Sequence, residues 1–211
     1  MDRRVFALGA SALLGATACG AQTSAKPQEG KDFVALDKRA PVDAQGKVEL
    51  VEFFWYGCPH CNAFEPQLHA WLKNLPKDVQ FRRVPVAFRT EMVPEQQLFY
   101  SLEALNEVER LHIKVFQTIH VDKQPLNTPE RIAAWVEKQG LDKTKFMQVF
   151  QSFSVVAKAR RATQLQDAYQ VAGVPALGVA GRFYTDGSLT GSMARALQVT
   201  DYLIGEARKG K

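Results

Sequence analysis

Residues 48–61 read Val48-Glu49-Leu50-Val51-Glu52-Phe53-Phe54-Trp55-Tyr56-Gly57-Cys58-Pro59-His60-Cys61, and this stretch decides the fold. Its first half is apolar almost throughout, as expected of a strand buried at the centre of a sheet. Glu52 is the exception, and a carboxylate in such a strand is costly unless it is paired or used. Pro59 suits the first position of a helix, because its missing N–H would have no partner there. The stretch therefore predicts a buried strand that leads into a helix.

The two cysteines of this stretch are separated by two residues and can close a small disulfide ring. A Cys-x-x-Cys pair where a strand gives way to a helix is typical of a redox centre. The thiolate is the reactive form of cysteine, and a helix N-terminus stabilises negative charge. We therefore expect Cys58, at the helix start, to be the attacking sulfur. Cys61, one turn into the helix, is expected to be the shielded resolving partner.

The rest of the chain alternates between sheet and helix patterns. A second strand after the first helix indicates the crossover unit of a parallel sheet. A long helical block follows before strand patterns return. The predicted elements are a strand over 79–88, helices between 90 and 154, a long helix over 155–172 that stops at Gly173, strands over 176–180 and 182–185, and a final helix capped by Ser192.

Two segments of the chain resemble one family. Phe53 to Pro66 is similar to the active-site segment of DsbA-type periplasmic thiol:disulfide oxidoreductases. Gly173-Val174-Pro175-Ala176 resembles the segment that holds the cis-proline of thioredoxin-fold proteins. The resemblance implies an α/β thioredoxin fold with an inserted helical domain. The expected organisation is an export signal at 1–21, a linker at 22–31, a thioredoxin-like domain built from 32–90 and 155–211, and a helical insertion at 91–154.

The resemblance also implies roles around the redox pair. Pro59 and His60, between the cysteines, tune the pair toward oxidation, and a protonated His60 can neutralise the Cys58 thiolate. Glu52 is similar to the buried acid of this family that helps to move a proton to or from Cys61. The alternatives are a surface histidine at position 60 and a solvated or arginine-paired glutamate at position 52. Glu49 and Glu65 carry no expected function.

Val174 and Pro175 are expected to form the opposite wall of the site. The resemblance implies a cis peptide bond before Pro175 and a substrate-binding role for the backbone of Val174. An apolar surface for unfolded clients is also conceivable, built from Trp55, Tyr56, Phe88, Met92 and Met193, although each of these is first expected to be core or ordinary surface.

A zinc site is a weaker alternative for the same cysteines. Cys58, His60 and Cys61 could be joined by a distant histidine (His69, His112 or His120), but no second close pair completes a tetrahedral set of ligands. We therefore expect no metal and no cofactor.

The first residues are typical of an export signal. Arg3-Arg4-Val5-Phe6 resembles the twin-arginine signal, while the general secretory route stays open. Val5 to Ala18 carries no charge and is too short to span a membrane. Cys19 follows small residues, so a lipid anchor there is an alternative to plain cleavage. After cleavage at Ala21 a single close cysteine pair remains, which restrains little unfolded chain and is better explained by chemistry.

Charge narrows the classes of partner. The chain has 211 residues and a formal net charge of +5, which is ordinary for a soluble globular protein. Its basic residues form two small clusters, Arg82/Arg83/Arg89 and Lys158/Arg160/Arg161. Solvated faces explain these clusters better than nucleic-acid binding does. An acidic or anionic partner surface stays open.

The function that these features favour is that of an exported, periplasmic dithiol oxidase. It would donate the Cys58–Cys61 disulfide to reduced, unfolded client proteins through a mixed disulfide at Cys58. By family inference, its recycling partner is a quinone-linked membrane oxidase of the DsbB type. The oligomeric state stays open, with a monomer as the default expectation. The alternatives are a thiol-disulfide isomerase or reductase, and a non-redox thioredoxin-fold module that binds metal or clients.

Overall fold

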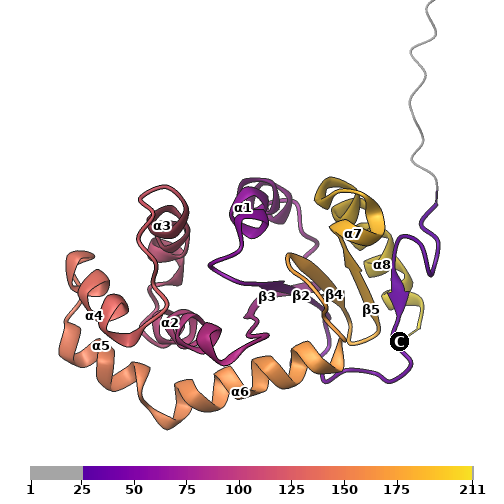
Figure 1. Ribbon diagram of the computed structural model, residues 1–211. Coiled ribbons are helices and arrows are strands. Elements are labelled where there is room, and N and C mark those ends of the chain that lie inside the picture. The colour runs from indigo at the N-terminus through magenta and orange to yellow at the C-terminus, as the bar shows by residue number, and fades with distance from the viewer. Residues whose placement is uncertain (1–25, 211) are drawn as a thin grey trace, which may run out of the picture.

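A mixed five-stranded sheet is the frame of the protein in the computed structural model, which describes residues 26–210 (Figure 1). The export signal expected at 1–21, Cys19 within it, and the first residues of the expected linker lie outside the described residues. The strand order is β1-β5-β4-β2-β3, in which β2 and β3 are parallel and the other pairs are antiparallel. The strands are β1 (Val34–Ala35), β2 (Val48–Phe54), β3 (Val79–Pro85), β4 (Ala176–Val179) and β5 (Phe183–Asp186).

Helices cover both sides of the sheet and extend beyond one edge of it. In Figure 1, α1, α7 and α8 lie on one side, α6 runs along the other, and α2 to α5 lie beyond β3. The helices are α1 (Pro59–Leu72), the short 3-10 helix η1 (Thr90–Met92), α2 (Val93–Ala104), α3 (Val108–His120), α4 (Pro129–Lys138), α5 (Lys143–Phe150), α6 (Phe153–Ala168), α7 (Gly187–Thr190) and α8 (Met193–Lys209). None of the helices in the described part of the chain combines the length and hydropathy needed to cross a bilayer.

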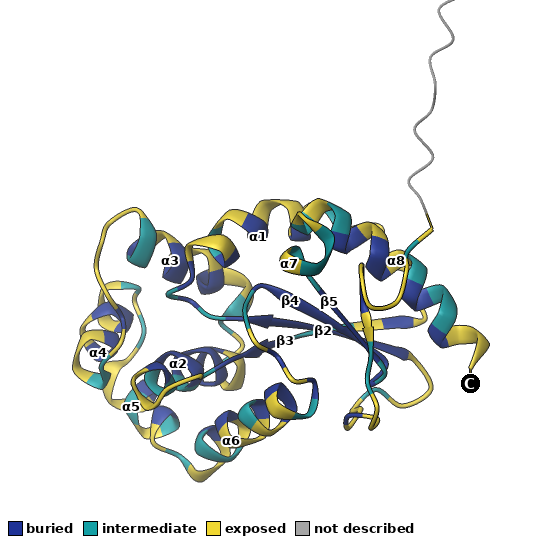
Figure 2. Ribbon diagram, turned by 45° about the vertical axis from the view of Figure 1, so that its right-hand side comes forward, coloured by how far each residue is buried: buried dark blue, intermediate teal, exposed yellow. Residues whose placement is uncertain are grey.

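Strand β2 is the centre of the molecule, because all its residues are buried (Figure 2). Val51 and Phe53 belong to the larger apolar cluster, which continues into the helices α2 to α6. Val48 and Leu50 belong to the second cluster, together with Leu68 of α1. The side chains of β2 in the two clusters thus follow the two-residue period of a strand up to Phe53, whereas Phe54 also joins the larger cluster.

The register of the sheet brings two distant segments together. Phe53, near the end of β2, pairs with Ala176, the first residue of β4. Pro175, which directly precedes Ala176, therefore lies beside the point where β2 ends and the loop to α1 begins. The cysteine pair and the expected opposite wall of the site meet at this place.

The helix caps agree with the sequence signals. The side chains of Thr128, Asp142 and Ser192 accept hydrogen bonds from backbone amides at the starts of α4, α5 and α8. These bonds satisfy N–H groups that have no partner within the helix. Helix α1 runs through Pro66 without a break.

Other boundaries differ from the prediction. Helix α6 ends at Ala168 rather than near residue 172, so Gly173 is not its stop. The chain turns at Gln170, which has a φ of +54°, and the buried Tyr169 accepts a hydrogen bond from the Gly181 amide. This tertiary contact ends the helix earlier than the local sequence indicates.

Three further segments also depart from the sequence pattern. Strand β3 ends at Pro85, which lacks an N–H, whereas the pattern extended to Phe88. The turn expected after β5 contains the short helix α7. Residues 26–31, placed in the linker by the sequence, include a turn in which the Gly30 amide donates to the Phe33 carbonyl at 2.8 Å.

Candidate redox site

A tight turn presents the first cysteine. The amide of Cys58 donates to the carbonyl of Trp55 at 3.0 Å, which closes the turn between β2 and α1. Cys58 is the N-cap residue of α1, and Pro59 follows as the first helical residue. Pro59 and His60 are exposed, whereas Cys58 and Cys61 are buried as free thiols. The structure therefore places the cysteines where the sequence predicts them, Cys58 at the helix start and Cys61 one turn further on.

The two thiols have opposite acidities. The pKa of Cys58 is lowered to about 6, first by a hydrogen bond from the Cys61 side chain and then by backbone amides of Cys61 and His60 and the charge of His60, against the opposing effect of burial. The pKa of Cys61 is raised far above its usual value, chiefly by burial and by the neighbouring Cys58. At neutral pH the site thus holds one thiolate and one thiol, which share a hydrogen bond.

The segment before β4 forms the facing wall. When Cys58 is protonated, its thiol donates to the carbonyl of Val174 at 3.4 Å, and the Val174–Pro175 peptide bond is cis. A pocket of about 430 Å³ opens beside this wall, and His60 and Met193 are among the residues that line it. Two of the segments quoted from the sequence thus meet within hydrogen-bonding distance.

Glu52 lies on β2, fully buried, and is paired with Arg83 of β3. Glu52 Oε2 lies 3.0 Å from Arg83 Nε, and because these atoms have no aligned hydrogen bond within the described residues, the contact is an ion pair only. Burial raises the pKa of Glu52 to about 8, although Arg83 opposes the rise. Glu52 also acts electrostatically on the thiol of Cys61. The carboxyl can therefore carry a proton near the second cysteine at neutral pH.

Arg83 continues into a chain of buried polar groups. Its guanidinium donates to Glu65 at 3.0 Å, and Glu65 accepts a second bond from Nε2 of His112 at 2.9 Å. The hydroxyl of Tyr56 lies 2.9 Å from Nδ1 of the same histidine. Burial lowers the pKa of His112, so the ring is neutral and donates through Nε2 while it accepts from Tyr56. Burial acts to raise the pKa of Glu65, but His112 and Arg83 outweigh it and lower that pKa.

Two more groups of the helical insertion hold the turn before Cys58. Glu95 of α2 accepts a hydrogen bond from the Gly57 amide at 3.0 Å. Burial raises the pKa of Glu95 to about 7. The indole of Trp55 lies near enough to lower that pKa, but its N–H does not meet the geometry of a hydrogen bond. On α3, Nε2 of His120 lies 2.8 Å from the Tyr56 carbonyl.

Two of the five residues weighed for an apolar client surface belong to the core, as first expected of them. Tyr56 and Met92 are buried: Tyr56 packs edge-on against Phe54 and Phe116, and the Met92 amide closes the turn before α2. Phe88 is 40% exposed. Trp55 and Met193 are half-buried. The structure therefore does not gather the five residues on one exposed surface.

Residues 26–210 contain no group of three or more histidines, cysteines or acids placed to hold a metal ion. Of the histidines considered as distant zinc ligands, His112 and His120 instead hydrogen-bond to Tyr56.

Several contributors were not expected from the sequence as parts of the site. Arg83 was noted only as one of a basic cluster, and Glu65 carried no expected function. Glu95 was not singled out at all, since a glutamate in the first turn of a helix is ordinary. Glu95 is followed directly by two glutamines, so its local sequence gives no signal of burial.

A family model described as a DSBA-like thioredoxin domain matches residues 49–198. This chain belongs to the DSBA-like thioredoxin family. The fold confirms the α/β thioredoxin architecture with inserted helices, and the match includes both the cysteine pair and the Pro175 segment.

Individual members of the family agree over almost the whole chain. The thiol:disulfide interchange protein DsbA of Burkholderia cepacia is 42% identical over 200 residues, which are 94% of each chain. The protein of the same name from Bordetella pertussis is 43% identical over 202 residues, or 93% of this chain and 96% of that one. The crystal structure of Pseudomonas aeruginosa DsbA has a TM-score of 0.81 at 40% identity, with 86% of this chain and 94% of that chain covered.

Proposed function

We propose that this protein is an exported thiol:disulfide oxidoreductase that acts as a dithiol oxidase on folding client proteins. The observation that carries the proposal is the unequal acidity of the pair, with a pKa of about 6 at Cys58 and a strongly raised pKa at Cys61. A thiolate that is stable in the reduced protein favours reduction of the disulfide, so the oxidised protein tends to give its disulfide away. Membership of the family supports the same direction.

The reaction is an exchange of sulfur bonds. A client thiolate attacks Cys58 Sγ of the Cys58–Cys61 disulfide, the bond between the two protein sulfurs breaks, and Cys61 leaves and takes up a proton. A second client thiolate then attacks the client sulfur of the mixed disulfide and releases Cys58 as a thiolate. The client loses two electrons and gains a disulfide, and the protein ends as a dithiol.

Glu52 is proposed as the proton donor for Cys61. It is buried below α1, its pKa of about 8 keeps it protonated at neutral pH, and its charge acts on the Cys61 thiol. Arg83 holds it in place at 3.0 Å. A carboxyl with a pKa near the working pH is suited to give and to regain a proton.

The surroundings of Cys58 are proposed to serve the attack and the client. His60 and Pro59 stand exposed between the cysteines, and the charge and amide of His60 help to lower the pKa of Cys58. Val174 already places its carbonyl 3.4 Å from Cys58 Sγ, so the backbone before Pro175 is within reach of a client segment bound to that sulfur. The adjoining pocket of about 430 Å³ gives room for a client side chain.

The cellular setting belongs to the same proposal. The export-type leader of the sequence and the family support a periplasmic protein that reaches its site by a cleavable signal, with a lipid anchor at Cys19 as the variant form. Turnover requires an oxidant that restores the disulfide. A quinone-linked membrane oxidase of the DsbB type is proposed for that step, acting on a monomer.

The test is oxidation of a reduced, unfolded protein by stoichiometric amounts of the oxidised chain. The wild type is expected to transfer one disulfide per molecule. Cys58→Ala is expected to abolish transfer, and Cys61→Ala, loaded with a mixed disulfide, is expected to release its partner slowly. A Cys58→Ala variant that still oxidises the client would overturn the mechanism. Faster reduction of an oxidised client than oxidation of a reduced one would instead favour a reductase or isomerase.

A further inference from the structure

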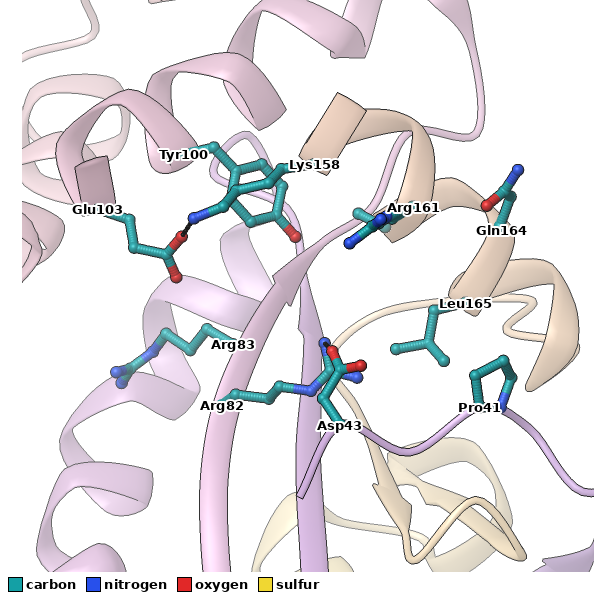
Figure 3. A pocket seen from close by; sticks show the side chains of 11 residues that line it. Pro41, Asp43, Arg82, Arg83, Tyr100, Glu103, Lys158, Arg161, Gln164 and Leu165 are labelled. Carbon is teal, nitrogen blue, oxygen red and sulfur yellow. Dashed lines mark hydrogen bonds and ion pairs between the residues drawn. The ribbon is translucent and has the colours of Figure 1, made fainter. Parts of the chain in front are cut away.

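The two basic clusters seen in the sequence meet at one pocket. Arg82 and Arg83 lie on β3, and Lys158 and Arg161 lie on α6, yet all four line a pocket of about 450 Å³ (Figure 3). Its volume is within the range of sites that bind small molecules in proteins. It shares no lining residue with the pocket beside Val174. The pocket is therefore a feature separate from the client wall of the redox site.

Three of these four cations already have acidic partners. Arg82 is paired with Glu49 at 3.0 Å and with Asp43 at 3.4 Å. Lys158 is paired with Glu103 at 2.7 Å (Figure 3). The guanidinium of Arg83 turns to the buried acids Glu52 and Glu65. Because these acids offset the charges of Arg82, Lys158 and Arg83, the three cations have little charge left to attract a ligand.

Arg161 and Tyr100 are different. Among residues 26–210, Arg161 makes no ion pair or hydrogen bond, and neither does the hydroxyl of Tyr100, although only 7% of that residue is exposed. In Figure 3 the hydroxyl and the guanidinium both point into the same space. Burial, with Glu103 as the next cause, raises the pKa of Tyr100, so the hydroxyl keeps its proton and stays a donor. The hydroxyl oxygen is not one of the enclosed polar atoms of the protein, so it is open to the pocket and free to donate to a ligand there.

We propose that this pocket binds a small monoanionic carboxylate with an apolar body, held by Arg161 and the hydroxyl of Tyr100. The planar guanidinium matches the two oxygens of a carboxylate, and the hydroxyl supplies a further donor. The apolar body lies against Leu165 and Ala162 of α6.

The acids at the pocket select the charge of the ligand. Asp43 and Glu103 line it together with the cations, so a doubly charged phosphate meets repulsion that a single carboxylate largely avoids. Arg82 faces two acids, Glu49 and Asp43, and Lys158 faces Glu103, so Arg161 is the cation of this pocket that has no acidic partner among residues 26–210. A ligand with a single negative charge supplies that partner.

The test is a calorimetric or NMR titration of the oxidised protein with phenylacetate. Saturable binding with a Kd below about 10 mM is expected for a ligand of this size. Uncharged phenylethanol and doubly charged phenyl phosphate are each expected to bind at least about fivefold more weakly. Arg161→Gln and Tyr100→Phe are each expected to weaken phenylacetate by a similar factor, since both keep the bulk of the side chain.

Arg160→Gln is the matched control, because Arg160 and Arg161 are both exposed neighbours on α6 but Arg160 does not line the pocket. It is expected to leave phenylacetate binding unchanged. The proposal is overturned if phenylacetate does not bind, if phenylethanol binds equally well, or if Arg160→Gln weakens binding as much as Arg161→Gln. Disulfide transfer by Arg161→Gln is expected to match the wild type, which separates this site from the proposed oxidase function.

Discussion

Glu95 accepts a hydrogen bond from the amide of Gly57 at 3.0 Å, so a buried acid of the helical insertion holds the residue directly before Cys58. Tyr56 of the same turn is held from α3, by His112 at its hydroxyl and by His120 at its carbonyl. The insertion therefore fixes the loop that presents Cys58. The contacts also place several titratable groups around this loop.

Replacement of Glu95 by Gln keeps an acceptor for Gly57 and removes the charge. The pKa of Glu95 in the folded protein is about 7, above its ordinary value of 4.5, so folding favours the neutral acid. The cost of its charge is absent below about pH 4.5 and grows as the pH rises to about 7. Glu95→Gln should therefore leave stability unchanged at pH 4.5 and raise it by about 2 kcal/mol at pH 8.

Denaturant unfolding at the two pH values checks this expectation, with the exposed Glu91→Gln as control. Equal behaviour of the Glu91 and Glu95 variants would remove the assigned role of Glu95.

The thiolate of Cys58 should stabilise the reduced protein in a pH-dependent way. Its pKa is about 6 in the fold and 9.0 for the ordinary thiol. The contribution is fully present above pH 9 and is lost as the pH falls through 6. With solvent screening taken into account, the unfolding free energy of the reduced wild type, relative to that of Cys58→Ser, should rise by about 2 kcal/mol between pH 5 and pH 9. The oxidised protein, which has no thiol at this position, should lack this gain, and a flat difference for the reduced protein would contradict it.

Gly57 should not tolerate a side chain. A Cβ at this position would lie 2.3 Å from a ring atom of Trp55, so the indole or the turn must move. Gly57→Ala should cost about 1–3 kcal/mol of unfolding free energy and slow disulfide transfer. Gly205→Ala is the matched comparison, because a Cβ there meets nothing within 4 Å and the position is helical. If both variants were equally stable, the packing of Trp55 against Gly57 would not matter.

Arg83 should be the most sensitive of the buried charges. It is paired with Glu52, whose raised pKa keeps it protonated at neutral pH, and with Glu65, which is ionised there. Arg83→Met leaves the buried Glu65 carboxylate without this cation, so it should destabilise the protein by about 3–5 kcal/mol at neutral pH and less at low pH, where Glu65 of the variant takes up a proton. Unfolding curves at pH 4 and pH 7 measure this. A loss that does not depend on pH would indicate a packing defect instead.

Local signals in the sequence were sufficient for the frame of the fold and the redox pair. Each of these signals determines the structure of residues only a few positions away. They are the apolar run before Cys58, the proline after it, and the helix caps at Thr128, Asp142 and Ser192. The structure reproduces each of them. The position of Pro175 opposite the pair followed from family resemblance rather than from pattern.

The remaining parts of the site depend on contacts between distant elements. Glu95 and His112 lie on helices of the insertion, and nothing near them in the sequence shows that their side chains reach the turn before Cys58. The local pattern leaves Tyr56 open between core and surface, because the helix α3 that covers it follows much later in the chain. The end of α6 was misplaced for the same reason, since Tyr169 turns inward to meet Gly181.

The reduction potential of the Cys58–Cys61 pair tests the central claim most directly. The protein is equilibrated with glutathione buffers, and the fractions of dithiol and disulfide are counted after acid quenching. The stabilised Cys58 thiolate predicts an oxidising pair, with a potential above about −200 mV. A potential near the value of thioredoxin, about −270 mV, would contradict the account and would make the protein a reductant.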